Sequence, residues 1–273
     1  MEIHDASDLR QSLSEELHAR AFYDFDGAGR FIRFVYLVGN DDSAVLNYVN
    51  DYLRSRALSP VQAAEKFYRI ELDGFALRVE RHTEFLTISF VEKGLKVQTG
   101  ISKDAFREAS LPHMPFAWAR NAPAALFHAI WVEVGGRPPT KLQQSDMLQV
   151  LDSRAVASNN FSDAAAQVHF AFDIDSAGYS RVVVFNKSIE AIRMGRIVQR
   201  IVEVETYRLL SLLGLATVKA YSTRLTDIEE VLNGLTNDLA NEIKKPDGQV
   251  QQLLTVLSSQ AADAEDIHSR TSY

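Results

Sequence analysis

The chain has 273 residues, of which 46% are hydrophobic and 24% are charged, as is typical of a folded protein of one or two domains. It contains no cysteine, which excludes disulfides, thiolate metal sites and a cysteine nucleophile. The formal net charge is −7 and no dense cluster of Lys and Arg occurs, so we expect no nucleic-acid partner. The longest nearly uncharged apolar stretch, residues 209–218, is far shorter than the roughly 20 residues of a membrane-spanning helix, so we expect the chain as given to be soluble.

The first 60 residues carry helix and strand signals in alternation. Residues 12–20 begin with a Ser that is followed three residues later by Glu, which predicts a short helix with a capping box. Residues 30–38, "RFIRFVYLV", are aromatic and β-branched and predict a strand. Residues 40–58 open with Asn and Asp and carry apolar residues at helical spacing, which predicts an amphipathic helix.

Two further strands are predicted at residues 66–73 and 75–92, joined as a hairpin at Gly74. In the second strand the apolar residues occupy odd positions as far as Phe85 and even positions from Leu86. Because neighbouring positions of a strand face opposite sides, this change of parity predicts a bulge or a break around residues 82–84.

The following segments complete an α/β region. Residues 102–124 contain three prolines and predict short helices and loops, whereas residues 126–134 predict a strand. Residues 146–159 begin as a helix and end as a strand, and residues 165–188 predict a hairpin with its turn near residues 175–178.

From Ser188 the pattern becomes helical, with no proline before Pro246. The period predicts a helix of roughly 25 to 28 residues, a second helix over residues 222–244 and a third from Gly248 onward. We therefore expect an α+β fold: an N-terminal α/β sandwich with a mixed sheet of about six to seven strands over residues 1–187, then long antiparallel α-helices. Residues 188–273 would form a stalk-like domain whose last helix continues in a longer protein.

No motif supports catalysis or cofactor binding. The seven histidines lack HxH, HxxxH and HExxH spacing, and no GxxxxGK[ST], GxGxxG or GxSxG motif occurs. We therefore expect a protein that is not an enzyme, with no catalytic residue and no evident cofactor. The sequence identifies no metal ligands.

Two groups of polar residues are candidates for ligand or partner contacts. The first, within "RVERHTEF", comprises Glu80, Arg81, His82 and Glu84. The second lines one face of the long helix, at spacings of three, four and three, and comprises Arg193, Arg196, Arg200 and Glu203. A solvated or inter-domain face is the more common role of such a row, and an anionic-ligand or partner surface that pairs with Glu80 or Glu84 is the functional alternative.

Three stretches, residues 15–22 ("EELHARAF"), 78–90 and 177–213, together resemble the DUF3422 family of bacterial predicted membrane-anchored proteins. The resemblance draws attention to His18 and Arg20, and we expect their segment to pack near the "RHTEF" strand in a buried polar junction. Family members are longer and end in two membrane spans. Their order of segments is similar to that of CorA-like magnesium channels.

The resemblance implies a soluble domain on the cytoplasmic face of the inner membrane, anchored through a missing C-terminal region. It also implies self-association into a homo-oligomer that senses or gates metal-ion transport, with Mg²⁺ as the candidate divalent cation. Two alternatives are a membrane-associated enzyme that uses Glu80, His82 and Glu84, and a purely structural scaffold.

Overall fold

The computed structural model describes residues 25–39, 41–242 and 250–271. The helix expected over residues 12–20 lies outside these ranges. The described chain divides into two compact units, one reaching Thr206 and the other starting at Tyr207. The predicted domain boundary after residue 187 stays a prediction, and the unit that contains the sheet includes the beginning of the long helix.

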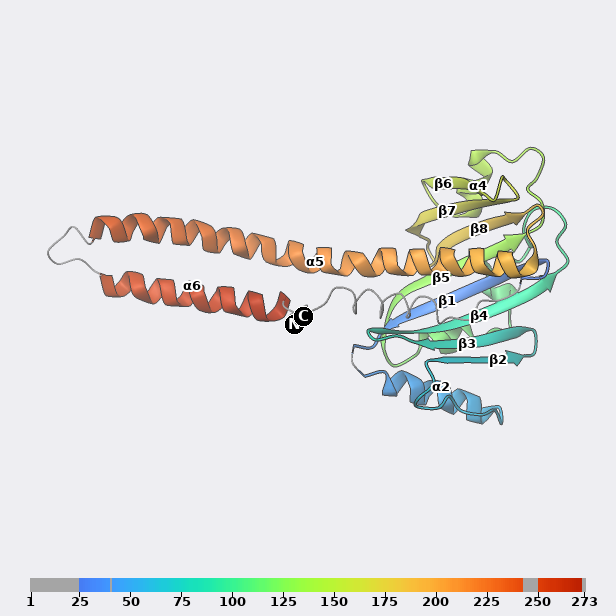
Figure 1. The fold of residues 1–273 in the computed structure, drawn as a ribbon, viewed down its shortest axis with the longest axis horizontal. Helices are drawn as coiled ribbons and strands as arrows, with labels where there is room; N and C mark the ends of the chain where they lie inside the picture. Colours follow the sequence, from blue (N-terminus) through green and yellow to red (C-terminus); the bar gives the residue numbers. More distant parts are fainter. Residues whose placement is uncertain (1–24, 40, 243–249, 272–273) are drawn as a thin grey trace. The chain divides into compact units, whose positions relative to one another are not determined.

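The first unit is built on one eight-stranded mixed sheet (Figure 1). Its strands are β1 (Ala28–Leu37), β2 (Phe67–Leu72), β3 (Phe75–Arg81), β4 (Phe85–Leu95), β5 (Ala125–Gly135), β6 (Val156–Phe161), β7 (Ala166–Ile174) and β8 (Ser180–Asn186). They are ordered β2-β3-β4-β1-β5-β8-β7-β6, and only the β5–β8 pair is parallel. The predicted α+β class with a mixed sheet is therefore confirmed, with eight strands instead of six to seven.

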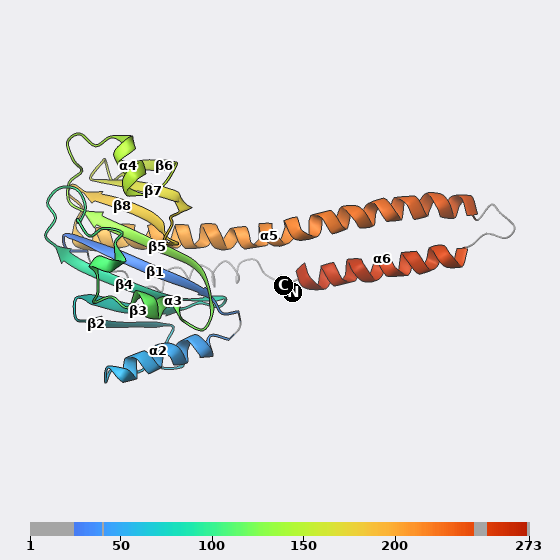
Figure 2. The same ribbon diagram turned by 180° about the vertical axis from the view of Figure 1, so that it is seen from behind.

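Helices lie on both faces of this sheet. They are α2 (Ser43–Ser55), the 3-10 helix η1 (Glu108–Ser110), α3 (Phe116–Arg120), α4 (Gln144–Val150) and α5 (Ala191–Glu242), and α6 (Val250–Thr271) follows in the second unit. Figure 2 shows α3 and α4 in front of the sheet and the beginning of α5, which belongs to the same unit, behind it. The sandwich arrangement is therefore confirmed.

Strand alternation places core residues on both faces of the sheet, and a smaller third cluster lies where Met147 and Leu151 pack against β7 and β8. On the side of α2 and α3, Phe34, Leu77 and Phe90 are fully buried against the helices. On the opposite side, Met194 and Val198 from the first turns of α5 pack with the apolar residues of β5 and β8. Because successive strand residues face opposite sides, strands such as β1 and β3 supply core residues to both faces, and polar side chains at these positions become buried too.

The strand predicted over residues 75–92 is wrong as a single element. β3 ends at Arg81 and β4 begins at Phe85, so the break predicted around residues 82–84 is the connection of a hairpin. The backbone N–H of His82 donates to the carbonyl oxygen of Phe85 at 2.9 Å and closes the turn. The change of parity in the sequence is the passage of the chain from one strand to the next.

The predicted division into a helix of roughly 25 to 28 residues and a second helix over residues 222–244 is also wrong, because α5 is one helix of 52 residues. A single Gly214 lowers helix propensity without removing a hydrogen bond, and no proline interrupts the segment. In the second unit, α5 and α6 run side by side and antiparallel in both views, as expected (Figures 1 and 2). Ile228 and Ile267 are buried there, and Arg224 lies 3.8 Å from Asp263.

Candidate functional site

A buried charge network lies within the sheet, on the face that α5 covers. The carboxylate of Glu80 (β3) pairs with Arg33 (β1) through one oxygen and with Arg78 (β3) at 2.5 Å through the other. Arg33, Arg78 and Glu80 are buried, and each residue is at most 3% exposed. Arg33 Nε–H donates to Ser89 Oγ at 3.1 Å, and Thr87 Oγ1–H lies 3.4 Å from Glu80. The network therefore joins β1, β3 and β4 across the sheet.

The pKa of Glu80 reflects this surrounding. Burial favours the neutral carboxyl, but the guanidinium groups of Arg33 and Arg78, with His82 as a further positive contribution, lower the pKa to about 2. Glu80 is therefore ionised at neutral pH. A carboxylate held in this way stabilises its cationic neighbours and is poorly suited to donate a proton as a general acid.

Arg81 is directed away from the network, as expected for the next residue of a strand. Its Nε–H and an Nη2–H donate to the two carboxylate oxygens of Asp42, at 2.5 and 3.0 Å. An Nη1–H donates to the carbonyl oxygen of Ala63. Arg81 therefore ties the end of β3 to the residue that precedes α2.

The remaining residues of the "RHTEF" group are placed differently again. The imidazole of His82 stacks on the ring of Phe85, with centroids 3.9 Å apart and planes at 12°. Glu84 is exposed. The structure thus brings His82 near Glu80, turns Arg81 toward Asp42 and leaves Glu84 at the surface.

The polar row of α5 lies on the exposed side of that helix. Arg193, Arg196 and Arg200 are exposed, and Glu203 accepts a hydrogen bond from Gln199 at 2.8 Å. A role for this row as a partner surface stays a prediction. His18 and Arg20 lie outside the described residues, so their expected packing near the "RHTEF" segment stays a prediction as well.

A second buried charge cluster, on the face of α2 and α3, was missed from the sequence. Arg30 Nε lies 3.3 Å from Glu92 and 3.4 Å from Glu133, and Trp131 Nε1–H donates to Glu133 at 2.7 Å. Burial raises the pKa of Glu133 to about 7, although Arg30 opposes the change. The available signal was a charged residue within an apolar strand, as in "RFIRF" and "IWVEV".

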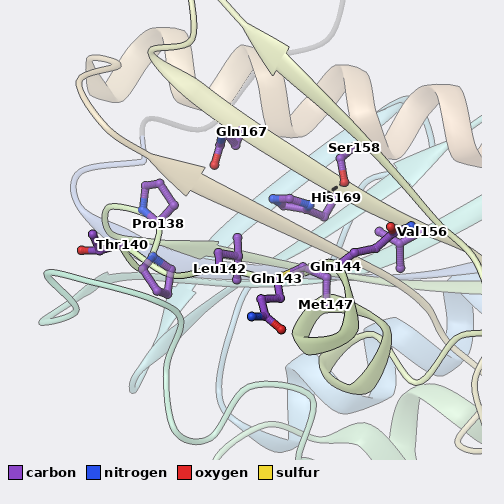
Figure 3. Close-up of a pocket in the computed structure, with 11 residues that line it drawn as sticks. Pro138, Thr140, Leu142, Gln143, Gln144, Met147, Val156, Ser158, Gln167 and His169 are labelled. Atoms are coloured by element: carbon purple, nitrogen blue, oxygen red, sulfur yellow. Dashed lines mark hydrogen bonds between the residues drawn. The ribbon is translucent and has the colours of Figure 1, made fainter.

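A cavity between α4 and the strands β6 and β7 was missed too (Figure 3). It has a volume of about 540 Å³, and its lining includes His169, Ser158 and Gln167. Ser158 Oγ and His169 Nδ1 are 2.7 Å apart. Sequence reasoning could note only that His169 stands in a hairpin strand, because the lining comes from three separate segments, residues 138–147, 156–158 and 167–169.

The described residues give no metal or membrane assignment. Among them, no three His, Cys, Asp or Glu side chains are grouped so that they could hold a metal ion. Within the same ranges, no helix combines the length and the apolar character that crossing a bilayer requires. Mg²⁺ binding therefore stays a prediction.

The fold and these polar clusters define an α+β protein in which a mixed sheet is followed by two long helices. A family model described as "Protein of unknown function (DUF3422)" matches residues 5–273, so the chain belongs to the DUF3422 family. The resemblance of the three sequence stretches is thereby confirmed at the level of the family. Comparisons with curated proteins and with solved structures gave no match.

Proposed function

We propose that this chain is a self-associating, non-enzymatic domain of a membrane-anchored protein, located at the cytoplasmic face of the inner membrane. In its most specific form, the assembly senses or gates metal-ion transport, as in CorA-like channels. The order of segments in the family resemblance supports the membrane and transport parts of this proposal. Self-association is supported by the surface of the helices.

The carrying observation is a set of exposed apolar side chains along one side of α5, which we call the apolar row. It consists of Leu212, Leu215, Val218 and Leu225, whose exposed fractions are 44%, 46%, 60% and 44%. Helix α6 also exposes Leu254, Val256 and Leu257. Apolar surface of this kind on long helices is typical of association surfaces, and burying it against protein is favourable.

A second copy of the chain is the partner that we infer. In a dimer with two-fold symmetry both subunits bury the same patch, so one contact between two copies covers both apolar rows. Leu215, Val218 and Leu225 recur at spacings of three and seven residues, which places them on neighbouring turns of one face of α5.

Substitution of the apolar row tests this proposal. We expect the Leu215→Glu/Val218→Glu double variant to be monomeric by light scattering under conditions in which the unmodified chain is not. Lys219→Glu changes the charge of a neighbouring exposed residue and is the matched control, expected to leave the mass unchanged. A double variant with the mass of the unmodified chain would reject the apolar row as the association surface.

The transport part makes a separate prediction. If the domain senses Mg²⁺, adding Mg²⁺ in place of a chelator will change the association constant, since carboxylate oxygens are ligands suited to this ion. An association constant that is identical with Mg²⁺ and with chelator would remove the sensing role and leave the assembly role intact.

The enzyme alternative receives less support from the geometry. Its central residue, Glu80, is enclosed by two guanidinium groups and keeps its charge at neutral pH. Such a position supports a structural role for the network, in which the carboxylate offsets the charge of Arg33 and Arg78.

A further inference from the structure

The cavity beside α4 has the size of a small-molecule site. Its volume of about 540 Å³ falls within the range of roughly 300 to 1,000 Å³ that is typical of ligand pockets. Leu142, Met147 and Val156 give it an apolar part, and Gln144 and Gln167 add amide groups. No Asp, Glu, Lys or Arg is among the residues that line it.

His169 supplies the polar group of this cavity that lacks a partner. His169 is 7% exposed, and its Nε2 is buried with no hydrogen-bond partner in the described structure. The other ring nitrogen, Nδ1, is occupied by Ser158. Figure 3 shows the imidazole extending from Ser158 into the space among Pro138, Leu142 and Gln167.

The pairing of His169 with Ser158 alone has an ordinary structural explanation. The two residues are opposite each other on the neighbouring strands β6 and β7, where cross-strand hydrogen bonds are common. That explanation accounts for Nδ1 only. A buried nitrogen without a partner is costly, so Nε2 is the atom at which an added group gains most.

We propose that this cavity binds a neutral ligand that carries an amide or hydroxyl group on a short apolar body, with Nε2 of His169 hydrogen-bonded to that group. Burial lowers the pKa of His169, so the imidazole is neutral at pH 7. The hydroxyl of Ser158 either donates to Nδ1 or accepts from it, which leaves Nε2 as donor or acceptor respectively. Amide and hydroxyl groups satisfy both cases, whereas an ionised ligand would find no opposite charge in the lining.

Three probes of nearly equal shape and different charge test the proposal. Isobutyramide is neutral, isobutyrate is an anion and isobutylammonium is a cation. With the full chain labelled with ¹⁵N-histidine, we expect isobutyramide to shift the ring signals of His169 saturably, with a Kd in the millimolar range on account of its small size. We expect the two ions to leave these signals unchanged.

Variants connect the binding to the cavity. His169→Phe identifies the signals and keeps a ring beside Phe185, whose centroid is 5.5 Å from that of the imidazole. Thr140→Trp, at an exposed residue of the lining, is expected to weaken isobutyramide binding at least tenfold by filling the cavity. Thr223→Trp, at an exposed position of α5, is the matched control and should leave the affinity unchanged.

Three results would overturn the proposal: no saturable shift of the His169 signals, equal shifts by an ionic probe, or unchanged binding in Thr140→Trp.

A capped glutamine, N-acetylglutaminamide, then identifies the source of the neutral group. Tighter binding than isobutyramide assigns a peptide side chain, and weaker binding assigns a free small molecule. The cavity lies in the sheet unit and includes no residue of the apolar row, so this test and the test of self-association fail independently.

Discussion

Glu80 is the residue whose replacement affects the sheet most directly, because it lies between two buried guanidinium groups. Removing one charge from such a group leaves the others uncompensated, which typically costs about 3–5 kcal/mol. We therefore expect Glu80→Gln to lower the free energy of unfolding by about 3 kcal/mol at pH 7, measured by urea denaturation. Glu84→Gln, at an exposed residue of the same hairpin, should change it by less than about 0.5 kcal/mol.

The same carboxylate predicts a pH dependence. Its pKa is about 2 in the folded chain, below the ordinary value of 4.5, so the native state binds fewer protons than the unfolded state. The stabilisation is present above the unfolded pKa and is lost as pH falls toward 2, and its size is on the order of 3 kcal/mol. Curves of unfolding free energy against pH that are parallel for the unmodified chain and Glu80→Gln would contradict this account.

Glu133 makes stability depend on pH in the opposite direction to Glu80. Its pKa is raised to about 7, so the native state binds more protons than the unfolded state between about pH 4.5 and pH 7, and stability falls as pH rises through this window. Glu133→Gln keeps an oxygen for Trp131 Nε1–H and removes the titration. We expect this variant to gain stability relative to the unmodified chain as pH is raised from 5 to 8. The exposed Glu190→Gln should show no such gain, and equal behaviour of the two variants would contradict the assignment.

At the scale of elements, the continuity of α5 makes a further prediction. A Cβ added at Gly214 meets no atom within 4 Å, so Gly214→Ala should stabilise the helix by about 0.5–1 kcal/mol through lower backbone entropy. Thermal unfolding followed by circular dichroism measures this gain. Gly178→Ala provides a control of opposite sign, because its φ of +89° disfavours any residue with a Cβ. A loss of helicity in Gly214→Ala would favour the break that the sequence pattern predicted.

Local pattern was enough to predict most strands and the amphipathic α2. It was not enough to separate β3 from β4, because the connection at residues 82–84 is polar and short and contains neither Gly nor Pro. It also failed to divide the helices correctly, since apolar spacing drifts gradually along α5.

The candidate site shows a different limit of sequence reasoning. Glu80 and His82 were selected from the sequence, but Arg33 is 47 positions away from Glu80, and only the pairing of β1 with β4 and of β4 with β3 brings them together. The lining of the cavity at His169 depends in the same way on the β6–β7 register and on α4. Long-range partners of this kind follow from strand order, which a single sequence specifies weakly.

At the scale of the whole molecule, two compact units are described, and the second exposes apolar side chains on both of its helices. Membership of the DUF3422 family covers both units. In this account the sheet unit carries the buried charge networks and the cavity, and the helices provide the surface for association. Separating these roles explains why Glu80 variants should alter stability while apolar-row variants alter mass.

Sedimentation velocity of the unmodified chain over a range of protein concentrations tests the central claim of self-association most directly. Because association is a mass-action equilibrium, we expect the weight-average mass to rise above the 30.6 kDa of one chain as the concentration increases. We also expect the Leu215→Glu/Val218→Glu variant to remain at the mass of one chain throughout. An unmodified chain that stays at 30.6 kDa at every concentration would contradict the proposed function.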